Sequence, residues 1–272
     1  MSEARMQETY KPGTFCWVEL ATSDANAAKS FYSQLFGWEY DDRPMGPDMV
    51  YTMVKLNGKE VGALYKLMAD QVAHGVPPHW LSYISVTNCD ESTQKAKAAG
   101  ATALKEPFDV MTVGRMSVIQ DPTGAVVAIW QAKDHHGAGI YNVPGSFCWN
   151  ELMTTDTAKA KEFYTSVFGW GADTQNFGDF EYTMFQNGER GAGGMLAITP
   201  EMGPIPPNWL VYFAVDDCDA KVQKATELGG KICKPADDIP GIGRFAILTE
   251  SVAFETLDYV EGRRDRSTGD GT

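Results

Sequence analysis

The sequence predicts an α+β protein of two tandem domains, each built from two βαβββ modules. Three observations carry this prediction: the length of the chain, an internal repeat and an alternation of strand and helix periods. At 272 residues the chain is about twice the usual size of a single domain. Residues 12–42 align without gaps on residues 144–174, with 17 of 31 positions identical. Repeat units of about 120 residues are domains rather than solenoid repeats.

The first module of each copy opens with a strand and a helix. A strand is predicted at residues 15–21, where apolar residues dominate. Asp24 is a suitable N-cap for the helix that follows, and this helix ends at Gly37. Two further strands form a hairpin around an Asn-Gly dipeptide, which is typical of two-residue turns, at residues 51–56 and 61–65.

The second module repeats this plan. A strand at residues 81–86 precedes a helix that Asp90 caps and that ends near Gly100. Three more strands follow at residues 101–104, 115–120 and 125–131. We therefore divide the chain into a flexible N-terminus (1–11), a first domain (12–131), a linker (132–143), a second domain (144–261) and a disordered tail (262–272).

Composition narrows the possible partners. The formal charge of −13 disfavours nucleic acid and anionic membrane surfaces, since both would repel the chain. No apolar run is long enough to cross a bilayer, and the first residues are too charged for a signal peptide. The five cysteines form no CxxC pair, which favours a reducing cytoplasm. We expect a cytoplasmic monomer or homodimer whose partner is a small molecule.

Three motifs point to a known family. They are a Thr-x-Asp sequence after the opening strand, a helix ending Phe-Tyr-x-x-x-Phe-Gly-Trp, and a late Asp121-Pro122-x-Gly124 turn. Together with the paired modules they resemble the vicinal oxygen chelate superfamily, which includes glyoxalase I, extradiol dioxygenases, fosfomycin-modifying enzymes and bleomycin-binding proteins. The resemblance covers residues 12–131 and 144–260. It implies that each eight-stranded sheet curls into a cup around a ligand, with helices outside and, in catalytic members, a divalent metal inside.

The metal-ligand positions of that family carry the wrong residues here. The first falls at Trp17 and Trp149, the second at Leu81 and Leu210, and the third at Ala128 and near Leu257. None of these side chains binds a metal. Of the four histidines, His74, His135 and His136 are expected to be solvated. The resemblance therefore implies a cup without the usual metal, and we expect no cofactor.

Strand alternation predicts which side chains line the cups, because successive side chains point to opposite faces. Cys16, Val18 and Leu20 suit the helix layer. The residues predicted to point inward in the first copy are Phe15, Trp17, Glu19, Leu81, Tyr83, Arg115 and Ser117, with His79 at the rim. In the second copy they are Trp149, Glu151, Leu210, Tyr212 and Arg244.

These residues suggest roles that compete with ordinary structural ones. Glu19 and Glu151, with Tyr83 and Tyr212, are candidate catalytic groups, since a carboxyl beside an indole is desolvated and its pKa rises. The glutamates could equally be salt-bridged at the rim. Candidate substrate-binding residues are Trp17, Trp149, Arg115, Arg244 and His79. The arginines would bind a carboxylate or enolate, or pair with the glutamates, and the tryptophans would stack on a planar ligand or pack in the core.

Three hypotheses for function remain open. The first is an enzyme that moves protons without a metal on an aromatic or carbonyl-rich substrate resembling a secondary metabolite. The second is a binding protein of the bleomycin-resistance type that sequesters a planar compound. The third is a metal-dependent lyase or dioxygenase, as in glyoxalases. Fold resemblance does not choose among them.

Overall fold

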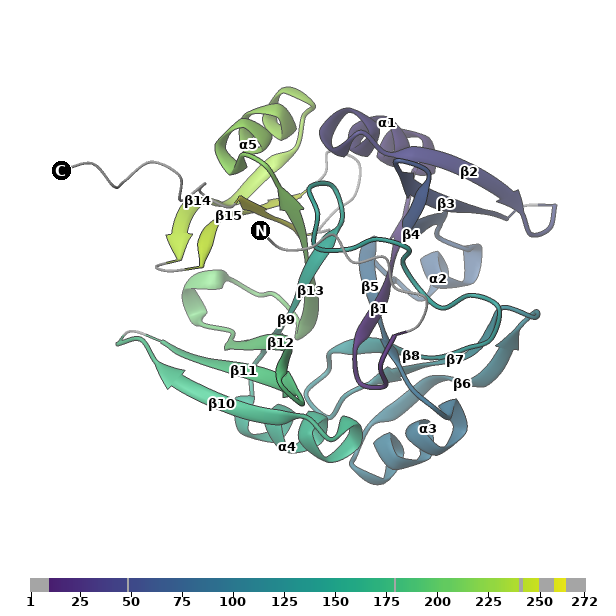
Figure 1. Ribbon diagram of the computed structural model, residues 1–272, viewed down its shortest axis with the longest axis vertical. Coiled ribbons are helices and arrows are strands. Elements are labelled where there is room, and N and C mark those ends of the chain that lie inside the picture. The colour runs from purple at the N-terminus through teal and green to yellow at the C-terminus, as the bar shows by residue number, and fades with distance from the viewer. Residues whose placement is uncertain (1–9, 48, 179, 240–241, 250–256, 263–272) are drawn as a thin grey trace.

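The computed structural model describes residues 10–47, 49–178, 180–239 and 242–249, together with the backbone of 257–262. These residues form two eight-stranded mixed sheets with the same strand order. Figure 1 shows residues 15–132 as one curled sheet on the right and residues 147–262 as the other on the left. We call the side of each sheet that faces away from the helices the first cup and the second cup.

The first sheet has the order β2-β3-β4-β1-β5-β8-β7-β6. Its first module contains β1 (Phe15–Thr22), α1 (Ala25–Phe36), β2 (Glu39–Pro44), β3 (Val50–Leu56) and β4 (Lys59–Lys66). A short helix, α2 (Ala69–Ala73), joins it to the second module. That module contains β5 (His79–Ser85), α3 (Cys89–Ala98), β6 (Thr102–Val110), β7 (Gly114–Gln120) and β8 (Val126–Ala132).

The second sheet has the equivalent order, β10-β11-β12-β9-β13-β16-β15-β14. Its first module contains β9 (Phe147–Thr154), α4 (Thr157–Phe168), β10 (Gly171–Asn176), β11 (Glu181–Asn187) and β12 (Arg190–Ala197), followed by a 3-10 turn at Pro200–Met202. Its second module contains β13 (Asn208–Val215), α5 (Cys218–Glu227), β14 (Lys231–Ile239), β15 (Gly243–Thr249) and β16 (Leu257–Gly262). The predicted α+β fold of paired βαβββ modules is confirmed.

Local signals place most helix ends. The Asp24 carboxylate accepts from the backbone N–H groups of Asn26 and Ala27, and Gly37 ends α1 in the left-handed conformation, both as predicted. The cap of α3 is Asn88 rather than Asp90. Both residue types suit helix starts, but Asn88 has the extended backbone of a cap and its side-chain oxygen accepts from the N–H of Glu91. The strand β2 was missing from the predicted elements because it is polar and mostly exposed.

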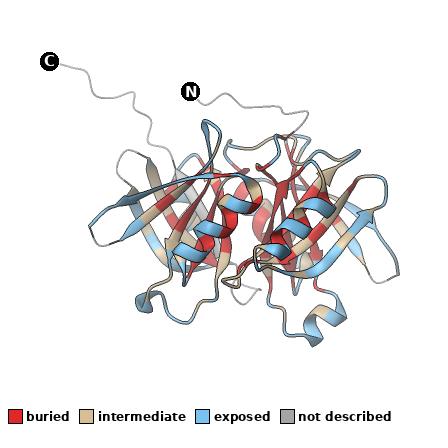
Figure 2. Cartoon of the chain, turned by 90° about the horizontal axis from the view of Figure 1, so that it is seen from below, coloured by how far each residue is buried: buried red, intermediate tan, exposed pale blue. Residues whose placement is uncertain are grey.

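The two sheets pack through their helix-bearing sides. Helix α1 lies beside α5, α3 lies beside α4, and β5 lies beside β13. Helices α1, α3, α4 and α5 each bury one side and expose the other, as Figure 2 shows, whereas the short helix α2 buries no residue. At the centre of this interface the Ser82 hydroxyl donates to the Asn150 side-chain oxygen at 2.5 Å, and both residues are almost fully buried.

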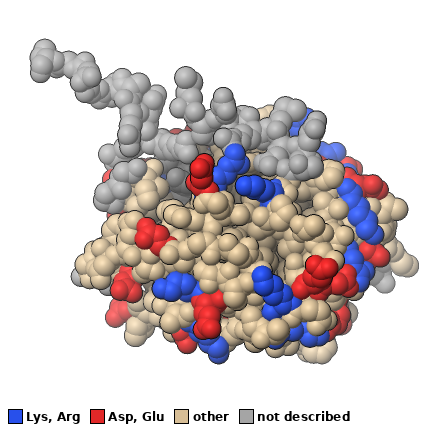
Figure 3. All heavy atoms as spheres, turned by 60° about the horizontal axis from the view of Figure 1, so that its bottom comes forward, with Lys and Arg blue, Asp and Glu red and all other residues tan. Residues whose placement is uncertain are grey.

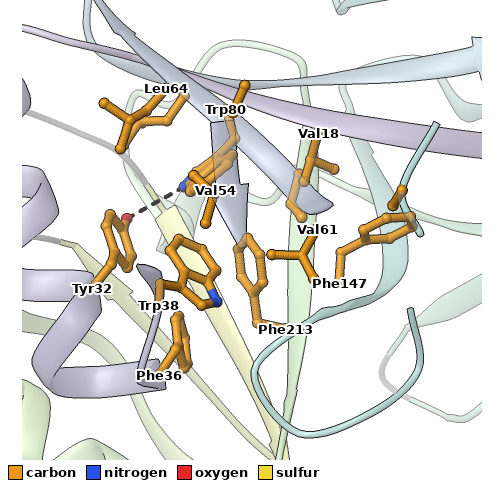
Figure 4. Packing of buried hydrophobic residues seen from close by; sticks show 14 of the residues in the cluster. Val18, Tyr32, Phe36, Trp38, Val54, Val61, Leu64, Trp80, Phe147 and Phe213 are labelled. Carbon is orange, nitrogen blue, oxygen red and sulfur yellow. Dashed lines mark hydrogen bonds between the residues drawn. The ribbon is translucent and has the colours of Figure 1, made fainter. Parts of the chain in front are cut away.

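The repeated motifs hold the two copies together. The indole of Trp38 donates to the carbonyl of Gly145 at 2.7 Å, and the indole of Trp170 donates to the carbonyl of Gly13 at 2.8 Å. Each Phe-Gly-Trp motif thus binds the Pro-Gly motif of the other copy. Around the first bond, aromatic rings from both copies interlock, as Figure 4 shows for Tyr32, Phe36, Trp38, Trp80 and Phe213. The motifs that revealed the repeat therefore form the interface between copies.

The ends of the predicted domains need one correction. Tyr10 was placed in a flexible N-terminus, yet it is buried and its hydroxyl donates to the carbonyl of Ala138 at 2.8 Å. Residues 1–9 and 263–272 lie outside the described residues, while Gly262, the first residue of the predicted tail, is the last residue of β16. The division of the chain into domains otherwise stays a prediction.

The surface carries mixed charge. On the face shown in Figure 3, acidic and basic side chains are interspersed and basic ones form no continuous patch. None of the helices among the described residues is long and apolar enough to cross a membrane.

Candidate functional site

The opening strand brings a tryptophan and a glutamate into each cup. In β1 the pairing with β5 shifts between Phe15 and Trp17, which forms a β-bulge. Phe15 therefore points to the helix side, where it packs against Trp170 and Trp209, and its predicted inward orientation is wrong. Beyond the bulge the alternation holds, so Trp17 and Glu19 face the first cup with Tyr83 opposite.

Two tyrosines hold the carboxyl group of Glu19. Tyr51 donates to Oε2 at 2.6 Å and Tyr83 donates to Oε1 at 3.1 Å. The indole of Trp17 lies next to this pair, since its nitrogen donates to the Tyr51 hydroxyl at 3.4 Å. Glu19 is only 7% exposed. Among the described residues this buried carboxyl group has no ionic partner, and both of its oxygens accept hydrogen bonds.

The second cup repeats this cluster. Glu151 is 6% exposed and is hydrogen-bonded to Tyr212 and Tyr182. The indole of Trp149 donates to the Tyr182 hydroxyl at 3.1 Å. We call the four residues of each cluster, Trp17, Glu19, Tyr51 and Tyr83 or Trp149, Glu151, Tyr182 and Tyr212, the carboxyl–tyrosine cluster.

Burial dominates the electrostatics of both clusters. It raises the pKa of Glu19 above its ordinary value, and it raises the pKa of Glu151 to about 7, although the tyrosine hydrogen bonds act in the opposite direction. Burial, and then the nearby charge of Glu19, also raise the pKa values of Tyr51 and Tyr83 well above normal. The phenols therefore stay protonated, as donors to the carboxyl group must.

Sequence reasoning missed Tyr51 and Tyr182, which complete the two clusters. Both stand in a Tyr-Thr-Met sequence that recurs in the two copies, on β3 and β11. This recurrence was the available signal. It lay outside the aligned segment of residues 12–42, and a lone tyrosine in a strand is typical of ordinary packing.

Arg115 and Arg244 are not in the cups, so their predicted inward orientation is wrong. Arg115 forms a two-point ion pair with Asp90 of α3, at 2.6 and 2.8 Å. Arg244 pairs with Asp219 of α5 in the same way, at 2.8 and 2.9 Å. Among the described residues neither arginine is hydrogen-bonded or paired to Glu19 or Glu151, because both guanidinium groups turn to the helices.

The error has a physical cause. The prediction assigned the apolar face of β7 to the helix layer, but the cup side is also apolar, and Met116 and Val118 pack there beside Trp130 and Ala128. The helix α3 presents polar groups instead, and its Thr93 hydroxyl is hydrogen-bonded to the predicted inward residue Ser117 at 2.7 Å. Apolar side chains indicate that one face of a strand is buried. When both faces of the sheet are covered, they do not indicate which face it is.

The remaining predicted residues lie as follows. Leu81 and Leu210 are buried on the inner side with Tyr83 and Tyr212. His79 lies at the start of β5, opposite Ala21, with Nδ1 2.8 Å from the carbonyl of Pro77. Burial lowers the pKa of His79, and among the described residues its hydrogen-bond partner is Pro77 rather than a member of the Glu19 cluster.

The residues at the family's metal positions do not fit a metal. In the first cup they are Trp17, Leu81 and Ala128, and the register confirms that Ala128 lies opposite Tyr83. In the second cup the third position was expected near Leu257, and the register specifies it as Tyr259, opposite Tyr212. Among the described residues no three His, Cys, Asp or Glu side chains come together as a metal site. We derive no reaction step from a metal.

His135 is not solvated as predicted. Its ring lies edge-on to Trp17, with the centroids 4.6 Å apart, and also contacts Trp130 at 6.0 Å. Its Nε2 atom is 3.4 Å from a carboxylate oxygen of Glu60. The linker between the domains therefore contributes a side chain to the first cup.

Comparison with known proteins agrees with this architecture. The model of the glyoxalase/bleomycin resistance protein/dioxygenase superfamily matches residues 14–129 and again residues 147–258. The two matches correspond to the two sheets.

Curated relatives align over nearly the whole chain. The Mycobacterium tuberculosis protein named "Putative glyoxylase CFP32" is 42% identical over 243 residues, covering 89% of this chain and 92% of the relative. The anthracycline biosynthesis protein DnrV of Streptomyces peucetius is 32% identical over 270 residues, covering 93% and 96%. DauV, an anthracycline biosynthesis protein of a Streptomyces species, is 34% identical over 245 residues, covering 85% and 87%.

Solved structures share the fold at low identity. A Mn(II)-bound glyoxalase from Novosphingobium aromaticivorans has a TM-score of 0.64 at 18% identity, covering 93% of this chain and 84% of the glyoxalase. A mutant of 4-hydroxymandelate synthase from Streptomyces coelicolor has a TM-score of 0.58 at 14% identity, covering 94% and 95%.

Proposed function

The chain belongs to the glyoxalase/bleomycin resistance protein/dioxygenase superfamily, and within it we propose an enzyme that transfers protons on a small planar carbonyl compound. The carboxyl–tyrosine cluster performs the chemistry, without the metal that the superfamily's usual ligands would hold. One observation carries the proposal: a buried carboxyl group, with a pKa of about 7 in the case of Glu151, lies between two tyrosine hydroxyls and beside an indole.

A carboxyl group with such a pKa suits general acid–base catalysis at neutral pH. About half of the Glu151 groups are ionised at pH 7, and the ionised form is a stronger base than an ordinary carboxylate. It accepts a proton from the carbon next to the ligand's carbonyl, and the C–H electron pair moves into an enolate. Once Glu151 is protonated, its carboxyl group carries no negative charge for the two phenol hydroxyls to stabilise. Tyr182 and Tyr212 then donate to the enolate oxygen, which now carries the charge. Return of the proton to carbon completes the cycle.

The walls of the cups suit an aromatic ligand. Each carboxyl group lies beside an indole, and the ring of Trp149 is partly exposed. The relatives named for anthracycline biosynthesis support this ligand class, because anthracyclines contain a planar ring system with carbonyl groups. These relatives also support a place in secondary metabolism.

Proton exchange on a model ketone tests the proposal. 2-Tetralone has a benzene ring and acidic hydrogens next to its carbonyl, and their exchange in D2O is followed by proton NMR. The wild-type protein should accelerate this exchange, and Glu151→Gln should reduce the acceleration by roughly 10²-fold or more, since amide nitrogen and oxygen are poor bases. Glu162→Gln, at an exposed position of α4, is the matched control and should leave the rate unchanged.

A different result would favour sequestration. If 1,8-dihydroxyanthraquinone binds tightly and its affinity is the same in Glu151→Gln and Glu19→Gln, while no variant or wild-type protein accelerates exchange, the enzyme proposal is wrong. A binding protein of the bleomycin-resistance type then replaces it. Activity that depends on an added divalent metal would instead restore the metal-dependent lyase or dioxygenase.

A further inference from the structure

We propose that the linker acts as a built-in ligand of the first cup, so that the site open to planar ligands is the second cup. In this proposal the ring of His135 occupies the space beside Trp17 in the first cup. The equivalent space beside Trp149 in the second cup is where a ligand binds. The class of ligand rests on the proposed function; the closure of the first cup does not. We call residues 133–139 the strap.

Hydrogen bonds tie the strap to the first sheet at both ends. At its start, the N–H groups of Lys133 and His135 both donate to the carbonyl of Val113, at 3.1 and 3.0 Å. At its end, the N–H of Ala138 donates to the carbonyl of Cys16 at 2.8 Å, and the N–H of Gly139 donates to that of Glu60 at 2.7 Å. The strap therefore bridges β1 and β4 below the point where these strands begin to pair.

The close approach of the strap requires a glycine. Gly137 has a φ of +121°, and a Cβ atom there would lie 2.4 Å from the carbonyl oxygen of Cys16 and 2.9 Å from the ring of Tyr10. An L-residue meets both a strained backbone and a clash with backbone atoms. The sequence at this point is thus suited to a strap that lies directly on β1.

Side chains of the first cup receive the His135 ring. The ring lies edge-on to Trp17, and the indole of Trp130 donates to the carbonyl of His135 at 3.0 Å. The carboxylate of Glu60 lies 3.4 Å from Nε2 and is also paired with Arg43 at 3.0 Å. As a result, Trp17 is only 4% exposed. A flat nitrogen heterocycle therefore already occupies the aromatic contact surface of this cup.

The second cup has small residues where the first has these partners. The sheet registers align Glu19 with Ala63 and Glu151 with Gly194, so Glu60, Ala63 and Tyr65 correspond to Gly191, Gly194 and Leu196. Gly191 therefore stands at the position that, in the first cup, holds the carboxylate facing His135.

Rings of the second cluster occupy the space that these glycines leave. A Cβ on Gly191 would lie 2.9 Å from the Trp149 ring, and one on Gly194 would lie within bonding distance of the Tyr182 hydroxyl. The Trp149 indole and the hydroxyl end of Tyr182 therefore pack directly against the backbone of β12. Trp149 is partly exposed and packs beside Leu210 and Tyr212, and among the described residues no ring lies edge-on to it as His135 lies to Trp17. A partly exposed indole that lies against glycine backbone suits the stacking of a planar ligand.

Hydroxyl-radical footprinting, read by peptide mass spectrometry, tests the closure without any ligand. In the native protein Trp149 should be oxidised several-fold faster than Trp17. His135→Ala should raise the rate at Trp17 toward that at Trp149, whereas His136→Ala, an exposed neighbour on the same strap, should not. Equal rates at the two indoles of the native protein, or no effect of His135→Ala, would overturn the proposal.

Binding of 1,8-dihydroxyanthraquinone tests the assignment of the open site. We expect one dye molecule per chain, protection of Trp149 but not Trp17, and an additional, weaker site in His135→Ala. Gly137→Ala, which displaces the strap through the backbone, should give the same additional site. Two sites in the native protein, protection of Trp17, or no saturable binding would each contradict the assignment. The proposed proton transfer is tested separately, by ketone exchange. If the protein binds one dye molecule per chain but does not accelerate exchange, only the proton-transfer proposal is wrong.

Discussion

At the residue scale, the carboxyl–tyrosine cluster shows where side-chain alternation along a strand predicts the orientation of a residue and where it does not. Trp17, Glu19 and Tyr83 were placed correctly, because beyond the bulge β1 and β5 are regular strands with one clear helix-facing side. Phe15 was misplaced because a bulge reverses the alternation and leaves no mark in a single sequence. Arg115 was misplaced because its carboxylate partner stands on a helix, and sequence alone does not show which polar groups a helix turns toward a sheet.

The raised pKa of Glu151 makes the stability of the protein depend on pH. The folded state holds this proton up to about pH 7, whereas the unfolded chain releases it near the ordinary value of 4.5. The contribution of Glu151 to the free energy of unfolding is therefore complete below pH 4.5 and is lost as the pH rises through 7. The loss amounts to about 3 kcal/mol at most. Glu151→Gln should remove this loss, so its free energy of unfolding relative to wild type should improve between pH 5 and pH 8.

Urea unfolding of both proteins at several pH values measures that difference. The comparison of variant with wild type cancels the other carboxyl groups, such as Asp90, whose pKa is lowered by Arg115 and which acts in the opposite direction. A difference that stays constant from pH 5 to pH 8 would show that the carboxyl group is not held protonated.

At the element scale, β12 shows why a glycine-rich strand is not a weak element here. Its Gly194 leaves room for the Tyr182 hydroxyl, and the parallel partner of that glycine is Glu151. The sequence showed three glycines in this strand without showing what they make room for. Which large ring fills which gap depends on pairings between strands that are far apart in the chain.

Gly194→Ala should therefore damage the second cup selectively. The added methyl group displaces the Tyr182 ring, which removes a hydrogen bond from Glu151 and should destabilise the fold by about 1–3 kcal/mol. Gly171→Ala on β10 is the matched control, because its new Cβ would have no neighbour closer than 3.7 Å. Denaturant unfolding gives the stability, and titration with 1,8-dihydroxyanthraquinone shows whether the cup still binds. Equal effects of the two substitutions would contradict the packing described for β12.

At the scale of the whole molecule, the repeated motifs join the two copies through two shared hydrophobic cores. The core that contains α1 also contains Phe213 and Ala225 of the second copy, and the core that contains α4 also contains Ile84 and Ile129 of the first. The repeat was evident in the sequence, and it correctly indicated two sheets. It did not indicate that the tryptophans of the repeat face the other copy. A repeated sequence shows that a residue has the same role in both copies, but it does not show which residue contacts it.

Trp38→Phe and Trp170→Phe test this coupling. Each substitution keeps an aromatic ring but leaves a carbonyl of Gly145 or Gly13 without its donor, which should cost about 1–3 kcal/mol. Both should lower the midpoint of a single unfolding transition, followed by circular dichroism and by tryptophan fluorescence. Phe180→Ala, at an exposed ring on the β11 side of a hairpin, should change it by less than about 0.5 kcal/mol. Two separate transitions would mean that the copies fold independently.

The buried pair of Ser82 and Asn150 makes the two halves of the chain non-interchangeable. In the repeat, Asn150 stands where the first copy has Val18, and Ser82 stands where the second copy has Val211. If two identical second halves were to associate, the internal symmetry would set each Asn150 opposite a valine, with its amide buried and unsatisfied. That mismatch costs about 1–3 kcal/mol at each of two places. Only a first half and a second half together satisfy the buried hydrogen bond at the centre of the interface. This bond therefore favours association of the two different halves over association of two identical ones.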